Sequence, residues 1–262
     1  MTLTIAWTRN AGKHEELVFA SDSRLRSFGS WDANPKLFQL ERSDCAIAFA
    51  GDTRFSYPMV SQIQAYVKSD PKFQSRFQDI SLLKGQILNM MNYMFSHKSD
   101  YEIPKVRFLL GGYSWDRKRF YIWHIFYDQK SKLFVAPVVK TWKGIKKQRH
   151  ISVIGDNLLD FRGRLIELMK SRHKFVNGYF DMEPFEVLRD MIRESKFETI
   201  GGTPQLLKVY EHLNCVPFAV RWKSEKETFT TLQGRPLQPF ETVKYPLIDS
   251  ESLEITAGSS FG

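Results

Sequence analysis

The stretch Ala48-Phe49-Ala50-Gly51-Asp52 closes an apolar run and decides how the surrounding chain is interpreted. Apolar residues fill positions 45–50, which predicts a buried strand. The residues that follow this glycine and aspartate include Tyr57, Val60 and Ile63 at helical spacing, which predicts a helix. The chain therefore passes from strand to helix at Gly51.

Strands and helices occur in separate blocks on both sides of this stretch. We expect strands at 3–8, 17–21, 37–40, within 105–139, and at 151–154, 206–212 and 218–222, and helices over 57–67, from Asp79 or Ser81, from about Asp156, and from Pro184. A block order of this kind predicts an α+β fold in which two sheets are faced by pairs of helices. No linker interrupts the pattern, so residues 1–262 are predicted to form a single domain. Residues 223–262 are predicted to be a C-terminal extension made of strand and tail.

The composition is that of an ordinary globular protein and excludes several classes. The 262 residues are 42% hydrophobic and 26% charged, with a net charge of +9 that favours acidic partners but names no function. No apolar run reaches the roughly 18 residues of a membrane helix, and no signal peptide is visible. Cys45 and Cys215 lie too far apart for a zinc motif or a disulfide framework. We therefore expect a cytoplasmic protein with no membrane contact, no metal and no cofactor.

Thr2 is the first candidate catalytic residue in the sequence. A small second residue normally permits removal of the initiator methionine, which would leave Thr2 with a free α-amine beside its hydroxyl. Such an amine has a pKa of about 8 and is partly neutral at physiological pH. It could take the hydroxyl proton while the oxygen attacks a carbonyl, which is one form of activated nucleophile.

Three further segments resemble a known family. They are Ala20-Ser21-Asp22-Ser23-Arg24, Lys36-Leu37-Phe38-Gln39-Leu40 and the opening stretch 48–52. Their order after a short Thr-Leu-Thr-Ile-Ala strand is similar to that of proteasome β subunits and the bacterial HslV peptidase, which are N-terminal-nucleophile (Ntn) hydrolases. The resemblance covers about the first 70 residues, and the order of elements stays similar to about residue 222. It implies a four-layer αββα sandwich of the proteasome-like Ntn-hydrolase type.

The resemblance also implies roles for five residues. Thr2 falls on the mature N-terminal threonine, Lys36 on the catalytic lysine and Asp22 on the acid that holds this lysine. Arg24 matches an arginine found two positions after the acid. Gly51 matches the glycine whose N–H stabilises the oxyanion. The physics is compatible, because a cation near the α-amine of Thr2 would lower its pKa and favour the basic form.

Two positions depart from the family pattern. Gly155 is followed by Asp156 where the family commonly has serine. We interpret Asp156 as a helix N-cap, with a carboxylate near the α-amine of Thr2 as the alternative. The family's later acid-and-serine pair has no clear counterpart, and Glu198 or Thr199 is the candidate substitute. Whether Asp156 or Glu198 completes the site is left open.

The predicted function is that of a threonine-type peptidase or amidohydrolase, which cleaves amide bonds through an acyl-enzyme on Thr2. The resemblance implies a homo-oligomeric ring, a peptide or protein substrate and an ATPase unfoldase as partner. The alternatives are an inactive ring or scaffold subunit and a non-proteolytic Ntn amidohydrolase. The basic segment 140–150 would suit phosphates of a nucleic acid, but a solvated loop is the preferred interpretation.

Overall fold

The computed structural model describes residues 2–12, 14–26, 29–99, 102–142, 150–176, 178–194, 196–224 and 227–258. Most of the basic segment noted above, residues 143–149, lies outside these ranges. The described strands of the larger sheet are β1 Leu3–Ala11, β2 His14–Ser21, β10 Ile151–Gly155, β11 Gln205–Tyr210, β12 Cys215–Lys223, β13 Thr228–Leu232, β14 Arg235–Pro236, β15 Leu247–Asp249 and β16 Ile255–Thr256. The remaining strands are β3 Leu25–Arg26, β4 Ser30–Trp31, β5 Leu37–Gln39, β6 Cys45–Gly51, β7 Val106–Ser114, β8 Arg119–Asp128 and β9 Leu133–Val135. The helices are α1 Thr53–Ser69, α2 Pro71–Gln74, α3 Ile80–Ser96, α4 Leu158–Ser171 and α5 Glu183–Arg193.

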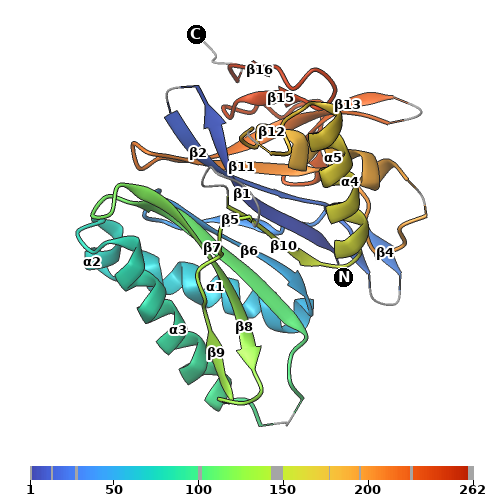
Figure 1. The fold of residues 1–262 in the computed structure, drawn as a ribbon. Coiled ribbons are helices and arrows are strands. Elements are labelled where there is room, and N and C mark those ends of the chain that lie inside the picture. Colours follow the sequence, from blue (N-terminus) through green and yellow to red (C-terminus); the bar gives the residue numbers. More distant parts are fainter. Residues whose placement is uncertain are drawn as a thin grey trace.

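The strands pair into three sheets. The larger sheet has the order β10-β1-β2-β11-β12-β13-β14, with β15 joined to β12 and β16 to β15. A second sheet runs β5-β6-β7-β8-β9, and β3 and β4 form a separate two-stranded ribbon. All pairs are antiparallel except β12 with β15. Figure 1 shows α1 and α3 beside the five-stranded sheet, and α4 and α5 beside the larger one.

Three apolar clusters hold these elements together. The first packs β1, β2, β11 and β12 against α4 and α5. The second packs the five-stranded sheet against α1 and α3. The third joins the opposite faces of the two sheets through small and aliphatic side chains, such as Ala6, Ala48 and Leu109. The alternation along β6 explains the division, because Ile47 and Phe49 belong to the second cluster whereas Ala46, Ala48 and Ala50 belong to the third.

The prediction of an α+β fold with four αββα layers is wrong. Strands account for 37% of the described residues and helices for 26%, and the described strands form three sheets rather than two. Much of the difference arises after residue 223, where β13, β14, β15 and β16 enlarge the nine-stranded sheet (Figure 1). Such pairing depends on long-range register, which hydrophobic periodicity does not reveal. The division of the chain into domains stays a prediction.

The helix predicted near Asp79 is confirmed. The Asp79 side chain accepts a hydrogen bond from the Ser81 backbone N–H and caps α3. Within the described ranges, no helix combines the length and the apolar character needed to span a membrane.

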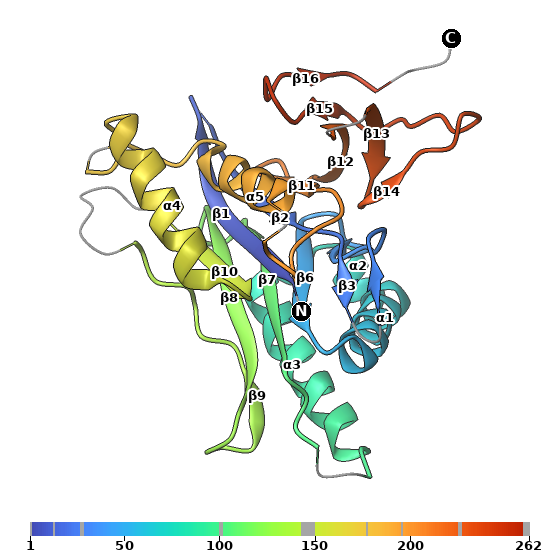
Figure 2. The same cartoon turned by 90° about the vertical axis from the view of Figure 1, so that its right-hand side faces the viewer.

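The start of β1 lies where the two large sheets come together. The Thr4 hydroxyl donates to the carbonyl of Phe49 in β6 at 3.0 Å. The Asp156 backbone N–H, just after β10, donates to the Thr2 carbonyl at 2.7 Å. Figure 2 shows β1, β6 and β10 converging in the middle of the molecule. The fold therefore brings the start of β1 and the ends of β6 and β10 together around Thr2, the first candidate residue of the sequence.

Candidate active site

Thr2, Asp22 and Lys36 meet in one buried cluster. The Lys36 Nζ donates to the Thr2 hydroxyl and, at 2.9 Å, to Asp22 Oδ1. The Thr2 hydroxyl in turn donates to Asp22 Oδ1. All three residues are almost completely removed from solvent. The positions at which β1 begins, β2 ends and β5 begins thus bring a hydroxyl, an ammonium and a carboxylate into direct contact.

The Asp22 carboxylate is held rigidly by backbone donors. Oδ1 accepts from the N–H of Leu3 at 2.9 Å. Oδ2 accepts from the N–H of Arg24 at 3.1 Å and from that of Gly201 at 3.2 Å. These bonds offset the cost of burying a charge and fix its orientation toward Lys36.

Lys36 is a buried cation with a limited set of partners. Besides Thr2 and Asp22, its Nζ donates to the Arg24 carbonyl at 2.6 Å. Burial lowers the pKa of Lys36, although the nearby Asp22 carboxylate acts in the opposite direction.

Gly51 places a backbone N–H beside the same cluster. The Phe49 N–H donates to the Lys36 carbonyl at 3.3 Å, and the Asp52 N–H donates to the Lys105 carbonyl on the opposite side at 3.0 Å. Because N–H groups alternate along a strand, the Gly51 N–H points to the Lys36 side. Gly51 has φ +117°, and a Cβ there would lie 2.0 Å from the Lys105 carbonyl oxygen. Only glycine fits this position.

Gly155 and Asp156 form the wall next to Thr2. A Cβ on Gly155, which has φ +113°, would lie 1.9 Å from the Thr2 carbonyl oxygen. The interpretation of Asp156 as a helix N-cap is wrong, because Asn157 occupies that position without a side-chain capping bond. Asp156 Oδ2 is buried and has no hydrogen-bond partner among the described residues. The carboxylate is therefore available for another role.

Two other candidates are directed elsewhere. The Arg24 guanidinium forms a two-point ion pair with Asp32, with distances of 2.7 and 2.8 Å. Only the backbone of Arg24 reaches the cluster. Glu198 is exposed and pairs with Arg26 at 2.6 Å, so its carboxylate does not complete the site. The Thr199 hydroxyl is buried without a partner in the described chain.

Two residues that support the cluster, Gly201 and Gln205, were not predicted from the sequence. Gly201 donates its N–H to Asp22, and Gln205 bridges the segments around the cluster. The Gln205 amide donates to the carbonyls of Asp22 and Asn34 at 3.0 and 2.8 Å and accepts from the Lys36 N–H at 3.0 Å. The pair Gly201-Gly202 was a visible signal for close approach, whereas nothing in the local pattern marks Gln205.

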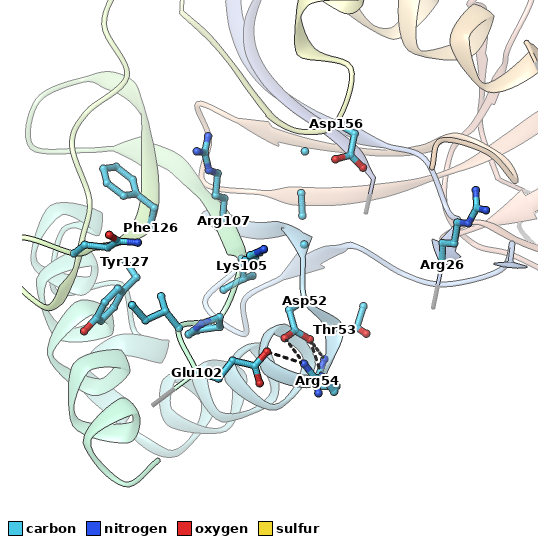
Figure 3. Close-up of a pocket in the computed structure, with 17 residues that line it drawn as sticks. Arg26, Asp52, Thr53, Arg54, Glu102, Lys105, Arg107, Phe126, Tyr127 and Asp156 are labelled. Carbon is cyan, nitrogen blue, oxygen red and sulfur yellow. Dashed lines mark hydrogen bonds and ion pairs between the residues drawn. The ribbon is translucent and has the colours of Figure 1, made fainter. Parts of the chain in front are cut away.

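A cavity of about 840 Å³ is lined by neighbours of the cluster, whereas Thr2, Asp22 and Lys36 are buried and do not line it. Gly51, Gly155 and Asp156 line it, together with charged side chains from the segments around β7 and α1 (Figure 3). Within the described residues, no group of three or more His, Cys, Asp and Glu side chains could hold a metal ion. The arrangement offers a hydroxyl in contact with a lysine and a carboxylate, and a backbone donor from Gly51, which lines the cavity; nucleophilic attack on a carbonyl uses groups of these kinds.

The architecture is similar to a proteasome-like fold, and the likeness is one of fold alone. A solved structure with this likeness is the Anbu (Gly-1) mutant from Hyphomicrobium sp. strain MC1. The TM-score is 0.55 at 14% sequence identity, and the match covers 82% of this chain and 85% of that chain. No family model and no curated protein matches the chain by sequence.

These comparisons correct the family assignment made from the sequence. The assignment to proteasome β subunits and HslV-like threonine peptidases is wrong as a statement of membership, because what is found is a likeness of fold to Anbu. At 14% identity this likeness shows the fold alone. The motifs behind the assignment lie at strand ends, where a shared fold can impose similar residues without a shared family.

Proposed function

We propose that this chain hydrolyses amide bonds in peptides through an acyl-enzyme on Thr2. The observation that carries the proposal is the contact of the Thr2 hydroxyl with both Lys36 and Asp22, next to Gly51 and an open cavity. The proteasome-like fold supports it, although a fold by itself hosts many activities.

In the first half of the reaction, the Thr2 oxygen attacks the carbonyl carbon of the scissile bond. Its proton passes to the α-amine of Thr2, exposed by removal of Met1, while Lys36 stabilises the developing alkoxide. The Gly51 N–H donates to the oxyanion, and one such donor is worth roughly 3 kcal/mol. The carbon–nitrogen bond then breaks, the proton moves to the leaving amine, and the acyl group remains as an ester on Thr2.

In the second half, water attacks the ester carbonyl and gives up a proton to the α-amine. The carbon–oxygen bond breaks, the carboxylic acid leaves and the Thr2 hydroxyl is restored. Each half uses the same oxyanion donor, so Gly51 acts twice in every cycle.

Asp156 is a positioning residue in this scheme. Its N–H bonds the Thr2 carbonyl at 2.7 Å, and its buried Oδ2 has no partner among the described residues. An α-amine released at Thr2 would supply the missing donor, and the carboxylate would orient that amine. An unpaired buried oxygen is otherwise costly, which is why we assign it a partner.

The assembly and location follow as part of the proposal. We propose a homo-oligomeric ring, a cytoplasmic location and an ATPase that delivers unfolded chains, because peptidase sites inside a chamber need an assisted supply of substrate. The chemistry proposed here uses no cofactor.

The test begins with the intact mass of the protein from its native host. We expect the mass of a chain that lacks Met1, and hydrolysis of peptidyl-coumarin amides by that material. Thr2→Ala should lower the rate on the order of a thousandfold or more. Thr2→Ser, which keeps a hydroxyl and still permits methionine removal, should keep measurable activity.

A second measurement separates loss of chemistry from loss of fold. Circular dichroism and urea denaturation of Thr2→Ala should match the parent protein. Retention of Met1, or equal activity of Thr2→Ala and the parent, would overturn the proposal and favour the inactive ring or scaffold subunit.

A further inference from the structure

Two cations in the cavity have no explanation in the mechanism above. Lys105 and Arg107 line the space that Gly51 and Asp156 also line. Figure 3 shows Lys105 and Arg107 on one side of the pocket and Asp156 on the other. Both side chains line the same cavity as Gly51, so a substrate bound in that cavity would contact them.

The strand direction explains why both side chains point into the cavity. Val106 lies between them and is buried in the core beneath α1 and α3. Because successive side chains along a strand point to opposite faces, Lys105 and Arg107 share the other face. Leu109, two residues further on, lies on that face and belongs to the core between the two sheets. Lys105 and Arg107 therefore lie on the same face of the sheet as Leu109, at the position where this face borders the cavity instead of the other sheet.

The other cations of the cavity are already neutralised. Arg54 pairs with Asp52 at 3.2 Å and with Glu102 at 3.3 Å. Arg26 pairs with Glu198 at 2.6 Å. Within the described chain, Lys105 and Arg107 form no ion pair, and both are exposed to the cavity.

Two unpaired cations at this spacing suit one anionic group. Residues two apart on a strand lie roughly 6.6 Å apart, so a carboxylate between them would meet both. Like charges this close repel each other until an anion binds. The Asp156 carboxylate on the other side would repel a substrate carboxylate and direct it toward Lys105 and Arg107.

We propose that Lys105 and Arg107 form a subsite for an acidic side chain on the acyl side of the scissile bond. The subsite adjoins the Gly51 segment because the Lys105 carbonyl accepts a hydrogen bond from the N–H of Asp52, and Gly51 lines the same cavity. A glutamate suits it best, since the apolar side chains of Ile103 and Phe126 in the same wall would contact its methylene groups. The inference rests on the proposed function, and it names the substrate class of that site.

The test compares peptidyl-coumarin amides that differ only in the last residue, which is Glu, Gln, Leu or Lys. We expect kcat/KM for the Glu peptide to exceed that for the isosteric Gln peptide by about fivefold, an advantage that falls with added salt. Lys105→Glu/Arg107→Glu should reverse the order, so that the Lys peptide becomes preferred. Lys72→Glu/Lys84→Glu, the same change in charge outside the cavity, should leave the order unchanged.

A binding measurement separates this inference from the proposed function. Dye-labelled Glu and Gln peptides are titrated against Thr2→Ala, with and without Lys105→Glu/Arg107→Glu, and fluorescence anisotropy gives each affinity. Hydrolysis with no preference for Glu, or a preference that survives the charge reversal, would overturn the acidic subsite and leave the proposed function standing. Selective binding of the Glu peptide without hydrolysis by the parent would support the subsite and overturn the proposed function. Neither binding preference nor hydrolysis would overturn both.

Discussion

Two buried pairs of a lysine and a carboxylate flank strand β2, and they differ in the groups that surround them. At the end of β2, Lys36 contacts Asp22 at 2.9 Å. At its beginning, Lys208 contacts Glu16 at 2.8 Å. Both lysines are almost fully buried, and burial lowers the pKa of each.

The surroundings of the two pairs differ in kind. Glu16 is shared with Arg9 at 2.6 Å, and Arg9 continues to Asp181. The Lys208 ammonium lies 5.1 Å from the centre of the Phe218 ring. Among the residues that the structure describes, the partners in this network are charged groups and a ring, with no serine or threonine hydroxyl.

The difference teaches that a buried ion pair with a shifted pKa does not define a reactive site. The Lys36 pair gains its candidate role from the contact with the Thr2 hydroxyl and from Gly51, whose N–H points to the Lys36 side and which lines a cavity. Within the described chain, the Lys208 pair contacts no threonine or serine hydroxyl, and it is expected to act on stability alone. Perturbed pKa values mark functional sites only in combination with such geometry.

The largest expected effect is the loss of hydrolysis in Asp22→Asn. The amide removes the negative charge that holds Lys36 and disturbs the contact with Thr2, so kcat/KM should fall about a hundredfold or more. Hydrolysis of a Glu-coumarin peptide measures it. Glu16→Gln, the matched change at the other pair, should keep kcat/KM close to the parent value, and a similar loss in both variants would break the comparison.

The second effect is the loss of stability in Glu16→Gln. This variant leaves the Lys208 charge buried without a carboxylate, although Arg9 keeps Asp181 as a partner. The free energy of unfolding should fall by about 3 kcal/mol, as measured by urea denaturation at pH 7.

The pH dependence identifies Lys208 as the cause of that loss. Because burial lowers the pKa of Lys208 below 10.5, the unfolded state binds more protons between the folded pKa and that value. Stability therefore rises with pH across this window. Without Glu16 the pKa of Lys208 in the folded state is lower still. The difference in the free energy of unfolding between Glu16→Gln and the parent should therefore become smaller from pH 7 to pH 9. A gap that stays constant would point to lost packing instead.

The smallest of the expected effects is a decrease in the free energy of unfolding caused by Gly51→Ala. The new Cβ would meet the Lys105 carbonyl, and φ +117° is strained for alanine, so we expect a loss of about 2 kcal/mol. Gly85→Ala is the control, because nothing lies within 4 Å of its Cβ in α3 and alanine favours helix. The control should raise the free energy of unfolding slightly in the same urea titration. Equal stability of both variants would contradict the close approach at Gly51.

Local pattern was sufficient for some elements and misleading for others. The capped start of α3 at Asp79 follows from side-chain chemistry within one turn, which is why it was predictable. The N-cap assigned to Asp156 failed because Asn157 takes a left-handed backbone, with φ 53°, that the sequence does not announce. The charge of Arg24 was visible, but its partner Asp32 depended on how the segment between β2 and β5 folds back.

By itself the sequence determined the order of strands and helices and placed Thr2, Asp22, Lys36 and Gly51 at element ends. Apolar periodicity and turn chemistry act over a few residues, so both can be recognised from the sequence. Only the tertiary structure decided that Gly201 and Gln205 support the cluster, that β13–β16 enlarge one sheet, and that Lys105 and Arg107 face the cavity. Those features arise from register and packing between distant segments, where many pairings satisfy the same local pattern and one minimises the free energy of the whole.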